Sequence, residues 1–233
     1  MRKAKVLAIQ NCEIEGFGEY EKYIIDQGLE YEVIHPYRDP VFPDPEKFDA
    51  VLLGGTPLSA YDIDEYPFLQ AESKFLEEAI SLNKRCLGIC FGAEILAIIL
   101  GAAATICRPK EIGGYRVRLT DAGKEDPLLA GFPDDFPVFQ WHGDQFTIPS
   151  KARLLAEGDG CPNQLFRLGN VVGVQFHLET NCWEAGLWAD AYAEELAEVH
   201  KTKEQILEEC RANEAERLKL AWRFIENFLG ELI

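Results

Sequence analysis

The 233-residue sequence predicts an α/β fold, a single doubly wound, mostly parallel sheet with helices on both faces and an antiparallel extension. Two observations support this fold class. In the first half of the chain, short apolar runs alternate with helix-forming segments, as the strand–helix–strand units of a parallel sheet require. In the middle of the chain, short β-prone segments follow one another between Gly, Pro and Asp residues, which favours antiparallel pairing.

The first half supplies the expected parallel strands and the helices between them. The strands are short apolar or β-prone runs, and the helices show apolar residues at helical spacing or end at a glycine. The expected strands are Val6–Ile9, Tyr31–Ile34, Ala50–Leu53 and Arg85–Ile89, and the expected helices are Tyr20–Gly28, Phe68–Leu82 and Phe91–Leu100.

The second half continues the sheet and ends in helices. The expected strands are Thr105–Thr120, Val138–Trp141, Leu154–Glu157, Gln164–Arg167 and Val171–Phe176. An amphipathic pattern predicts a helix over Ala185–Val199, and a second helix is expected from about residue 203 to residue 229. The chain contains no internal repeat or linker-like stretch, so we expect one domain over residues 1–233.

Composition and charge exclude several classes of function. The net charge of −17 comes from 40 acidic and 23 basic residues, and such a surface repels phosphate backbones, so we expect no nucleic-acid partner. No run approaches the roughly 18 apolar residues of a membrane helix, so we expect no membrane partner. The N-terminal apolar stretch Val6–Ile9 is too short for a signal peptide, which favours a cytoplasmic protein.

The cysteine pattern does not indicate a disulfide framework or a metal site. Seven cysteines, an odd number, are scattered along the chain. Cys86 and Cys90 are separated by three residues, which is neither the CxxC of redox centres nor a usual zinc knuckle. The sequence therefore predicts no metal and no cofactor.

The densest chemical signal lies around Cys90. A strand enters Gly88–Gly92, a G-x-C-x-G run, and a helix follows at once, which is the nucleophile-elbow pattern with cysteine as the nucleophile. The two glycines are expected because other Cβ atoms would clash at so sharp a turn. The helix N-terminus should favour the thiolate and leave the Phe91 amide facing a developing oxyanion. The alternative is that Cys90 is a small buried hydrophobic residue.

His177 and Glu179 follow the last apolar run of the sheet. Residues two apart on a strand point the same way, so Glu179 is expected to hold one ring nitrogen of His177 while the other serves the thiol. The carboxyl ends of parallel strands share one edge of the sheet, which places His177 near Cys90, within hydrogen-bond reach. A structural His–Glu pair is the alternative. His142, in a polar cluster at another strand end, either lines the site or anchors a loop.

Taken together, these motifs resemble the class I, or triad, glutamine amidotransferases over nearly the whole chain. Leu53–Ser59 (LGGTPLS) resembles the glycine-rich oxyanion strand of that family. Glu111–Thr120 (EIGGYRVRLT) and Trp141–Asp144 (WHGD) resemble segments of the branch that is similar to the amidotransferase domain of GMP synthase. The resemblance implies a flavodoxin-like amidotransferase architecture.

The resemblance also implies an activity, the hydrolysis of the glutamine side-chain amide to glutamate and ammonia through a glutamyl thioester on Cys90. By the same resemblance, His177 and Glu179 complete the triad, and backbone amides at Gly55 and Phe91 hold the oxyanion. Substrate contacts are implied at Gly54, Glu94 and His142.

Two positions depart from the family pattern. Glu94 replaces a usual glutamine that grips the amino-acid end of the substrate, and its carboxylate would attract an α-ammonium but repel an α-carboxylate. Leu178 replaces a proline between His177 and Glu179, which relaxes one backbone angle and leaves both functional side chains in place.

Three functions are compatible with the sequence. The first is a glutaminase or amidotransferase subunit, which would deliver ammonia to a separate synthetase partner. The second is a hydrolase of γ-glutamyl amides or peptides, which Glu94 favours. The third is a non-catalytic binding protein on the same scaffold, which has no need of a nucleophile with an aligned base. In each case the ligand is a small molecule, either glutamine or a γ-glutamyl compound.

Overall fold

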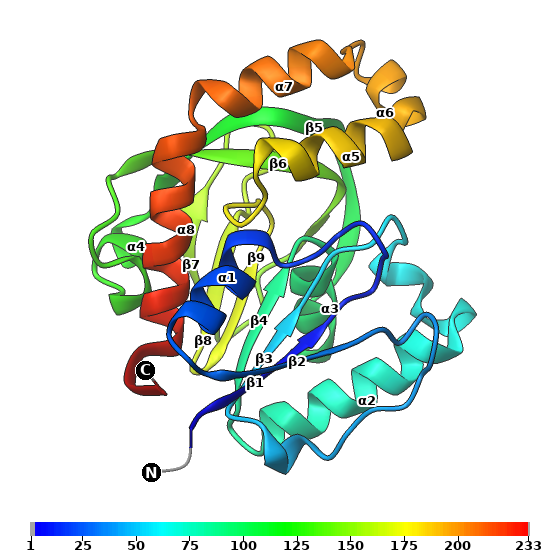
Figure 1. The fold of residues 1–233 in the computed structure, drawn as a ribbon, viewed down its shortest axis with the longest axis vertical. Coiled ribbons are helices and arrows are strands. Elements are labelled where there is room, and N and C mark those ends of the chain that lie inside the picture. The colour runs from blue at the N-terminus through cyan, green and yellow to red at the C-terminus, as the bar shows by residue number, and fades with distance from the viewer. Residues whose placement is uncertain (1–2, 233) are drawn as a thin grey trace.

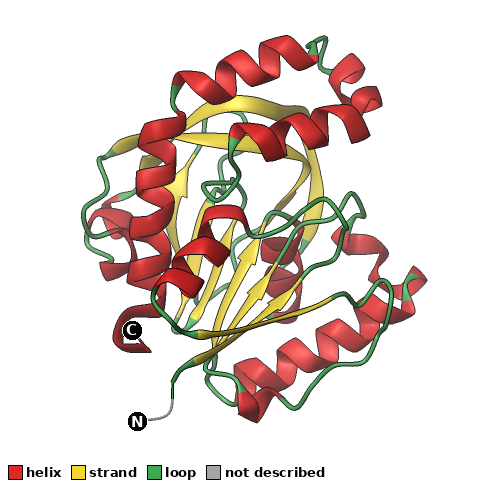
Figure 2. Ribbon diagram, in the orientation of Figure 1, coloured by secondary structure: helices red, strands yellow, loops and turns green. Residues whose placement is uncertain are grey.

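A computed structural model describes residues 3–232 of the chain. Their strands form one nine-stranded sheet in the order β2-β1-β3-β4-β9-β8-β7-β5-β6 (Figures 1 and 2). The first five strands in this order are parallel, namely β1 (Lys5–Ile9), β2 (Glu30–Ile34), β3 (Ala50–Leu53), β4 (Arg85–Ile89) and β9 (Val171–Val174). The other four pair antiparallel, namely β5 (Ala104–Leu119), β6 (Asp135–Phe146), β7 (Arg153–Glu157) and β8 (Leu165–Leu168). The predicted fold class is confirmed.

Helices cover both faces of the parallel half. The helices are α1 (Gly18–Asp26), α2 (Pro67–Ser81), α3 (Phe91–Ile99), α4 (Asp121–Lys124), α5 (Cys182–Ala191), α6 (Ala193–Glu198), α7 (Lys203–Ala212) and α8 (Glu214–Leu229). Short 3₁₀ turns occupy Pro45–Lys47, Ala60–Glu65, Pro127–Leu129 and Gly230–Leu232. Helices α1 and α8 share one apolar core with the sheet, and α2 and α3 share the core on the opposite face. This two-sided burial explains why the central strands are apolar at every position, as in β3.

A third apolar cluster lies over the antiparallel extension, where α5 and α7 cross β5 and β6 (Figure 1). The predicted helix over residues 185–199 is divided at Tyr192, whose backbone leaves the helical region at φ −111° and ψ 38°. The helix expected from 203 to 229 is divided at Asn213, with φ −129°. The prediction of two uninterrupted helices is wrong, because α7 packs on β5 while α8 packs against α1 and β6, so the chain must turn between them.

Two strand ends differ from the prediction in ways that shape the site. Strand β6 extends to Phe146, so His142 lies within a continuous strand and does not interrupt one. Strand β9 ends at Val174, and the following segment crosses to β6, where His177 forms an isolated antiparallel bridge with Phe139. The sheet thus brings the parallel and antiparallel halves together at His177.

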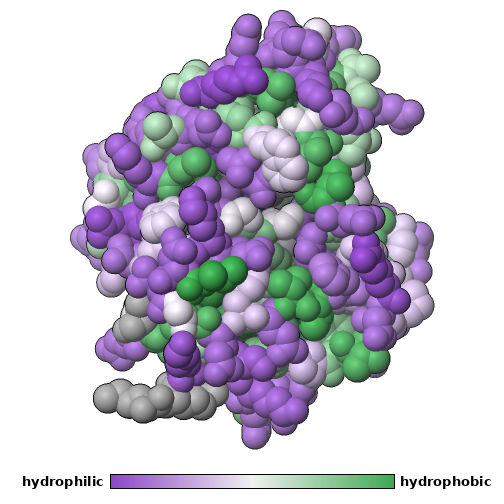
Figure 3. Space-filling model, in the orientation of Figure 1, coloured by the Kyte–Doolittle hydropathy of each residue, from purple (hydrophilic) through white to green (hydrophobic). Residues whose placement is uncertain are grey.

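The surface agrees with the strongly negative composition. The face in Figure 3 is mostly hydrophilic, with smaller groups of apolar side chains among the polar ones. No helix within residues 3–232 combines the length and the apolar character needed to span a bilayer.

Candidate active site

Cys90 occupies a strained turn between β4 and α3. Its backbone has φ 54° and ψ −114°, a conformation that non-glycine residues rarely adopt and that usually marks a functional site. The flanking glycines are sterically required, because a Cβ on Gly88 would collide with the Gly92 carbonyl and a Cβ on Gly92 would collide with the Leu53 carbonyl. The elbow geometry expected from the G-x-C-x-G run is therefore present.

The thiol of Cys90 is buried and neutral at rest. Burial raises the pKa of this thiol well above its usual range, and the nearby carboxyl groups of Glu94 and Glu15 raise the pKa further. The amide of Phe91, at the first position of α3, donates toward the sulfur and acts in the opposite direction. The Phe91 amide thus favours the thiolate, as expected of the helix N-terminus, and desolvation by burial acts more strongly against it.

His177 and Glu179 form the expected pair. His177 Nδ1 lies 2.6 Å from Glu179 Oε1, and both side chains are buried. The ring of His177 is held by an edge-on contact with Trp188, and its backbone is held by hydrogen bonds with Phe139 of 2.8 and 3.0 Å. With Nδ1 committed to the carboxylate, Nε2 is the nitrogen that remains for acid–base chemistry.

The segment that carries Glu179 is fixed from two sides. The Glu19 amide, at the N-terminus of α1, donates to the Glu179 carbonyl at 3.0 Å. The buried guanidinium of Arg217 donates to the carbonyl of Thr180, whose hydroxyl in turn donates to Glu179 Oε1 at 3.2 Å. These contacts hold the carboxylate in position with Leu178 between His177 and Glu179.

Cys90 and His177 face the same pocket, but no hydrogen bond joins them among the described residues. The Cys90 sulfur lies 3.7 Å from the Trp141 carbonyl, which accepts from the thiol, and 3.9 Å from Gln175 Nε2. The expected thiol–imidazole hydrogen bond is therefore not formed in this state. A neutral thiol takes the carbonyl as its acceptor, and it must turn away from Trp141 to reach the imidazole.

The residues predicted to form the oxyanion hole lie beside Cys90. The position of a Cβ on Gly55 is 3.8 Å from Cys90 Cβ, and the Gly55 amide has no hydrogen-bond partner among the described residues. Gly54 is placed differently, because its amide donates to the Ile9 carbonyl at 3.0 Å and its Cα faces the Phe17 ring. Gly54 packs the turn and does not line the pocket.

Glu94 lines the pocket as a neutral carboxylic acid. It is 2% exposed, and burial raises its pKa to about 8, although a hydrogen bond of 3.1 Å from Gln175 Nε2 acts in the opposite direction. At neutral pH its side chain is mostly protonated and resembles glutamine in shape and polarity. This corrects the sequence-based expectation of a carboxylate charge at this position.

His142 both anchors the wall and lines the pocket. Its Nε2 lies 3.0 Å from Glu111 Oε2, and its Nδ1 lies 2.7 Å from the Asp144 carbonyl. Glu111 also accepts from Gln164 Nε2 and from the Cys161 amide, so the network is buried and largely satisfied. Both alternatives left open by the sequence hold together, since the ring belongs to the pocket wall and fixes it.

The pocket itself, about 260 Å³, joins the two halves of the molecule. The predicted residues Cys90, Phe91, Glu94, His142 and His177 line it, and the carboxylate of Glu179 lies behind the ring of His177. The pocket also contains Trp141 and Asp144 of the WHGD motif, and three residues that sequence reasoning missed, namely Glu15, Tyr192 and Glu195. No local motif marks these three as part of a site.

Glu15 is the most consequential of the missed residues. It is buried, it accepts a hydrogen bond of 2.6 Å from Tyr192, and its carboxyl occupies the space that a side chain at Gly55 would fill. Burial raises the pKa of Glu15, which favours the neutral acid beside the expected oxyanion position. A neutral carboxyl there does not repel a developing negative charge.

Comparisons with known proteins agree with this geometry. The family model described as "Glutamine amidotransferase class-I" matches residues 17–187. The glutamine amidotransferase-like protein YfeJ of Salmonella typhimurium is 32% identical over 91% of this chain and 92% of its own. A subunit of the glutamine-hydrolysing GMP synthase of Saccharolobus solfataricus is 30% identical over 73% of this chain and 89% of its own.

The fold comparison gives the same result. The crystal structure of a glutamine amidotransferase from Thermotoga maritima superposes with a TM-score of 0.90 at 31% identity, and it covers 99% of this chain and all of the other.

Proposed function

The chain belongs to the class I glutamine amidotransferase family and is an enzyme that acts on a C–N amide bond, and we propose that it hydrolyses glutamine to glutamate and ammonia through a thioester on Cys90. The observation that carries the proposal is the placement of a strained, buried cysteine in one pocket with an imidazole whose far nitrogen is held by a carboxylate. Such an arrangement serves nucleophilic attack on a carbonyl carbon.

The first half of the reaction forms the thioester. The neutral thiol of Cys90 turns from the Trp141 carbonyl, and His177 Nε2 takes its proton as the sulfur bonds to the amide carbon. The carbonyl oxygen becomes an oxyanion, which accepts from the amides of Gly55 and Phe91. Collapse of this intermediate breaks the C–N bond, and the imidazolium of His177 returns the proton to the leaving ammonia.

The second half releases glutamate. His177 takes a proton from a water molecule, which attacks the thioester carbon, and the same oxyanion contacts form again. The C–S bond then breaks, and the sulfur regains a proton from His177. Because burial raises the pKa of the Cys90 thiol, the protonated form is restored after each turnover.

We assign the neutral Glu94 to the part of the site where family members usually carry glutamine. With a pKa of about 8, the side chain offers a hydroxyl donor and a carbonyl acceptor at neutral pH, as an amide does. Ionisation above that pKa would repel the α-carboxylate of glutamine. The KM for glutamine is therefore expected to rise as the pH passes about 8.

Ammonia released at this site would be used by a separate synthetase. The relatives from the glutamine-hydrolysing GMP synthases support this arrangement, because their names describe one subunit of a larger enzyme. We propose that residues 1–233 form one amidotransferase domain and that the acceptor of the nitrogen binds to the partner synthetase.

A second candidate is the hydrolysis of γ-glutamyl amides. The pocket wall includes Arg108 and Lys110 of β5. These cations would attract a carboxylate on the leaving amine, which ammonia lacks but a peptide provides. The chemistry at Cys90 would be unchanged.

One assay separates the two candidates. Purified protein and its Cys90→Ala variant are incubated with glutamine and, separately, with γ-glutamyl peptides, and the release of ammonia or amine is measured. Turnover by the wild type of glutamine but not of γ-glutamyl peptides supports the first candidate. Turnover of peptides without turnover of glutamine replaces it with the second. Equal turnover by Cys90→Ala removes both, because neither mechanism proceeds without the thiol.

A further inference from the structure

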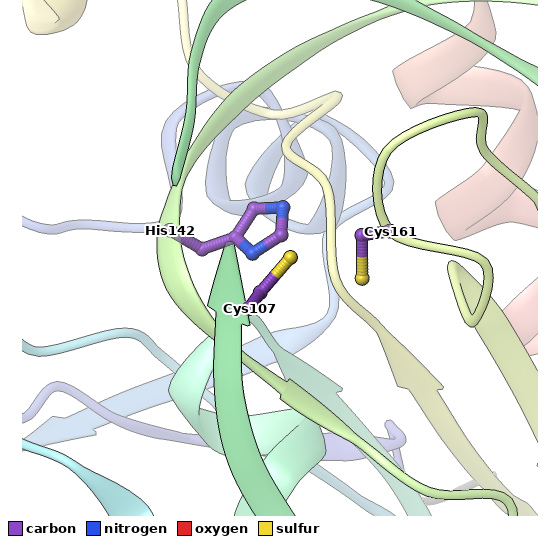
Figure 4. Close-up of side chains that lie close together, drawn as sticks. All are labelled: Cys107, His142 and Cys161. Carbon is purple, nitrogen blue, oxygen red and sulfur yellow. The ribbon is translucent and has the colours of Figure 1, made fainter. Parts of the chain in front are cut away.

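Three metal-ligating side chains from separate parts of the antiparallel extension converge behind the pocket wall (Figure 4). Cys107 comes from β5, His142 from β6, and Cys161 from the loop between β7 and β8. Their two sulfurs and one ring nitrogen all lie within 4.8 Å of one another. All three residues are buried, with at most 4% of their surface exposed.

We propose that Cys107, His142 and Cys161 bind a zinc ion as a structural metal site that is distinct from the catalytic Cys90. Two thiolates and an imidazole are a donor set that zinc prefers over harder cations such as Mg²⁺ or Ca²⁺. Tetrahedral zinc with Zn–S bonds of about 2.3 Å places two sulfurs about 3.8 Å apart, so modest side-chain rotations suffice. Water or Gln145 Oε1, which lies 3.3 Å from Cys161 Sγ, completes the fourth position.

The electrostatic surroundings favour a cation at this cluster. The carboxylates of Glu111 and Asp144 act on Cys107, and Glu111 also acts on Cys161. A bare thiolate is unfavourable in this field, and burial raises the pKa of both thiols. A bound divalent cation makes the thiolates favourable, because its positive charge is attracted by the same carboxylates and neutralises the negative charge of the sulfurs.

Glu111 and His142 already have the arrangement that supports a metal-bound histidine. Metal-ligating histidines usually donate their remote N–H to a carboxylate, and His142 Nε2 lies 3.0 Å from Glu111 Oε2. The ion would bind Nδ1, which in this state faces the Asp144 carbonyl at 2.7 Å. Binding therefore replaces one hydrogen bond and keeps the other.

The binding step involves no oxidation. Two Zn–S bonds and one Zn–N bond form, two S–H bonds break, and two protons pass to solvent. Since both thiols are protonated in the metal-free protein, the affinity for zinc should rise with pH, by up to about 100-fold per unit for the release of two protons.

A second group of potential ligands in the described part of the chain is a poorer candidate. Cys182, Cys210 and Glu214 lie between α5, α7 and α8. The guanidinium of Arg217, however, lies 3.1 Å from Cys210 Sγ, and this fixed positive charge opposes a metal cation. The two clusters therefore provide a matched comparison within one molecule.

The test is zinc binding by the reduced, full-length protein. Zinc affinity is measured by competition with a chromogenic chelator, and Co²⁺ is used as a probe whose absorption bands reveal thiolate ligands. We expect one tight zinc equivalent in the wild type, sulfur-to-cobalt charge-transfer bands, and a rise in the unfolding temperature with zinc. Glu111→Gln should weaken binding by about 10–100-fold.

Three variants locate the ion. The double variant Cys107→Ala/Cys161→Ala should lose the tight equivalent and the charge-transfer bands, whereas Cys182→Ala/Cys210→Ala and Cys90→Ala should keep both. Far-UV circular dichroism checks that each variant folds. Absence of a tight equivalent in the wild type, or its retention in Cys107→Ala/Cys161→Ala, overturns the proposal. Loss of the equivalent in Cys90→Ala moves the ion to the catalytic site and also overturns it. None of these outcomes depends on glutamine turnover.

Discussion

The two halves of the sheet position their functional groups by different means. In the parallel half, Cys90 is placed by its own backbone, since the strained turn and the close approach of Gly88 and Gly92 act within five residues. In the antiparallel extension, His142 is placed by side chains from three strands or loops, through Glu111 and its partners. A nucleophile can thus be specified locally, whereas the wall that faces it requires long-range polar contacts.

The largest expected effect tests whether the two halves cooperate in catalysis. His177→Ala removes the proposed base, which lies where the halves meet, so glutamine turnover should fall by about 10⁴-fold or more while the protein stays folded. Steady-state ammonia release measures this, with His200→Asn as the control because His200 is exposed and has a positive φ that asparagine tolerates. A loss of less than tenfold would mean that His177 is not the base.

In the parallel half, a single added methyl group is expected to disrupt the turn at Cys90. Gly88→Ala places a Cβ against the Gly92 carbonyl, so unfolding free energy should fall by at least about 3 kcal/mol, with loss of turnover. Gly16→Ala is the matched control, because no atom lies within 4 Å of its Cβ position. Urea unfolding of both variants measures the difference, and equal stability would show that the turn is not sterically required.

The antiparallel extension is expected to lose stability when its buried polar network is disrupted. Glu111→Ala leaves three donors without their acceptor, those of His142, Gln164 and the Cys161 amide, and should cost about 2–3 kcal/mol in the metal-free protein. Glu157→Ala, at the end of β7, provides the control. If the two variants unfold at the same urea concentration, the network does not stabilise the wall.

The smallest expected effect concerns the buried acid Glu94. Its folded-state pKa of about 8 exceeds its ordinary value of 4.5, so the folded state binds the proton more tightly than the unfolded chain. The stability from this group is complete below about pH 4.5 and is lost as the pH rises to about 8. Glu94→Gln should flatten this slope and keep the KM for glutamine constant through pH 8.

Glu72 offers a matched comparison for Glu94. Glu72 is buried away from the pocket, and burial raises its pKa to about 8 as well. Its Oε1 accepts a hydrogen bond from Asn11 Nδ2. Glu72→Gln should flatten the stability slope by a similar amount without changing the pH dependence of KM. If both variants alter KM equally, the effect comes from stability, and Glu94 does not contact the substrate.

The same contrast explains what the sequence could predict. Short sequence patterns predict the family, the order of strands and helices, the elbow and the His177–Glu179 pair. The fold and the family resemblance are confirmed, and His177 lies 2.6 Å from Glu179 as expected. The effect of burial, which raises the pKa of the Cys90 thiol, could not be predicted, because burial depends on the packed fold and not on the local turn. The breaks at Tyr192 and Asn213 were missed, since apolar periodicity continues across them.

Residues that act through long-range contacts had no sequence signal. Glu15 reaches the space beside Gly55 from a loop after β1, and Cys107 meets Cys161 only because β5 and the β7–β8 loop adjoin. The pairing of β6 with the segment at His177, which closes the pocket, joins positions far apart in sequence.

Trapping the covalent intermediate tests the central claim most directly. Wild-type protein is mixed with glutamine, quenched with acid during turnover, digested and analysed by mass spectrometry. We predict that one glutamyl group is attached to the peptide that contains Cys90, and that His177→Ala, which lacks the base, accumulates far less of it. Continued glutamine turnover with no adduct on Cys90, or an adduct on another cysteine, would contradict the account.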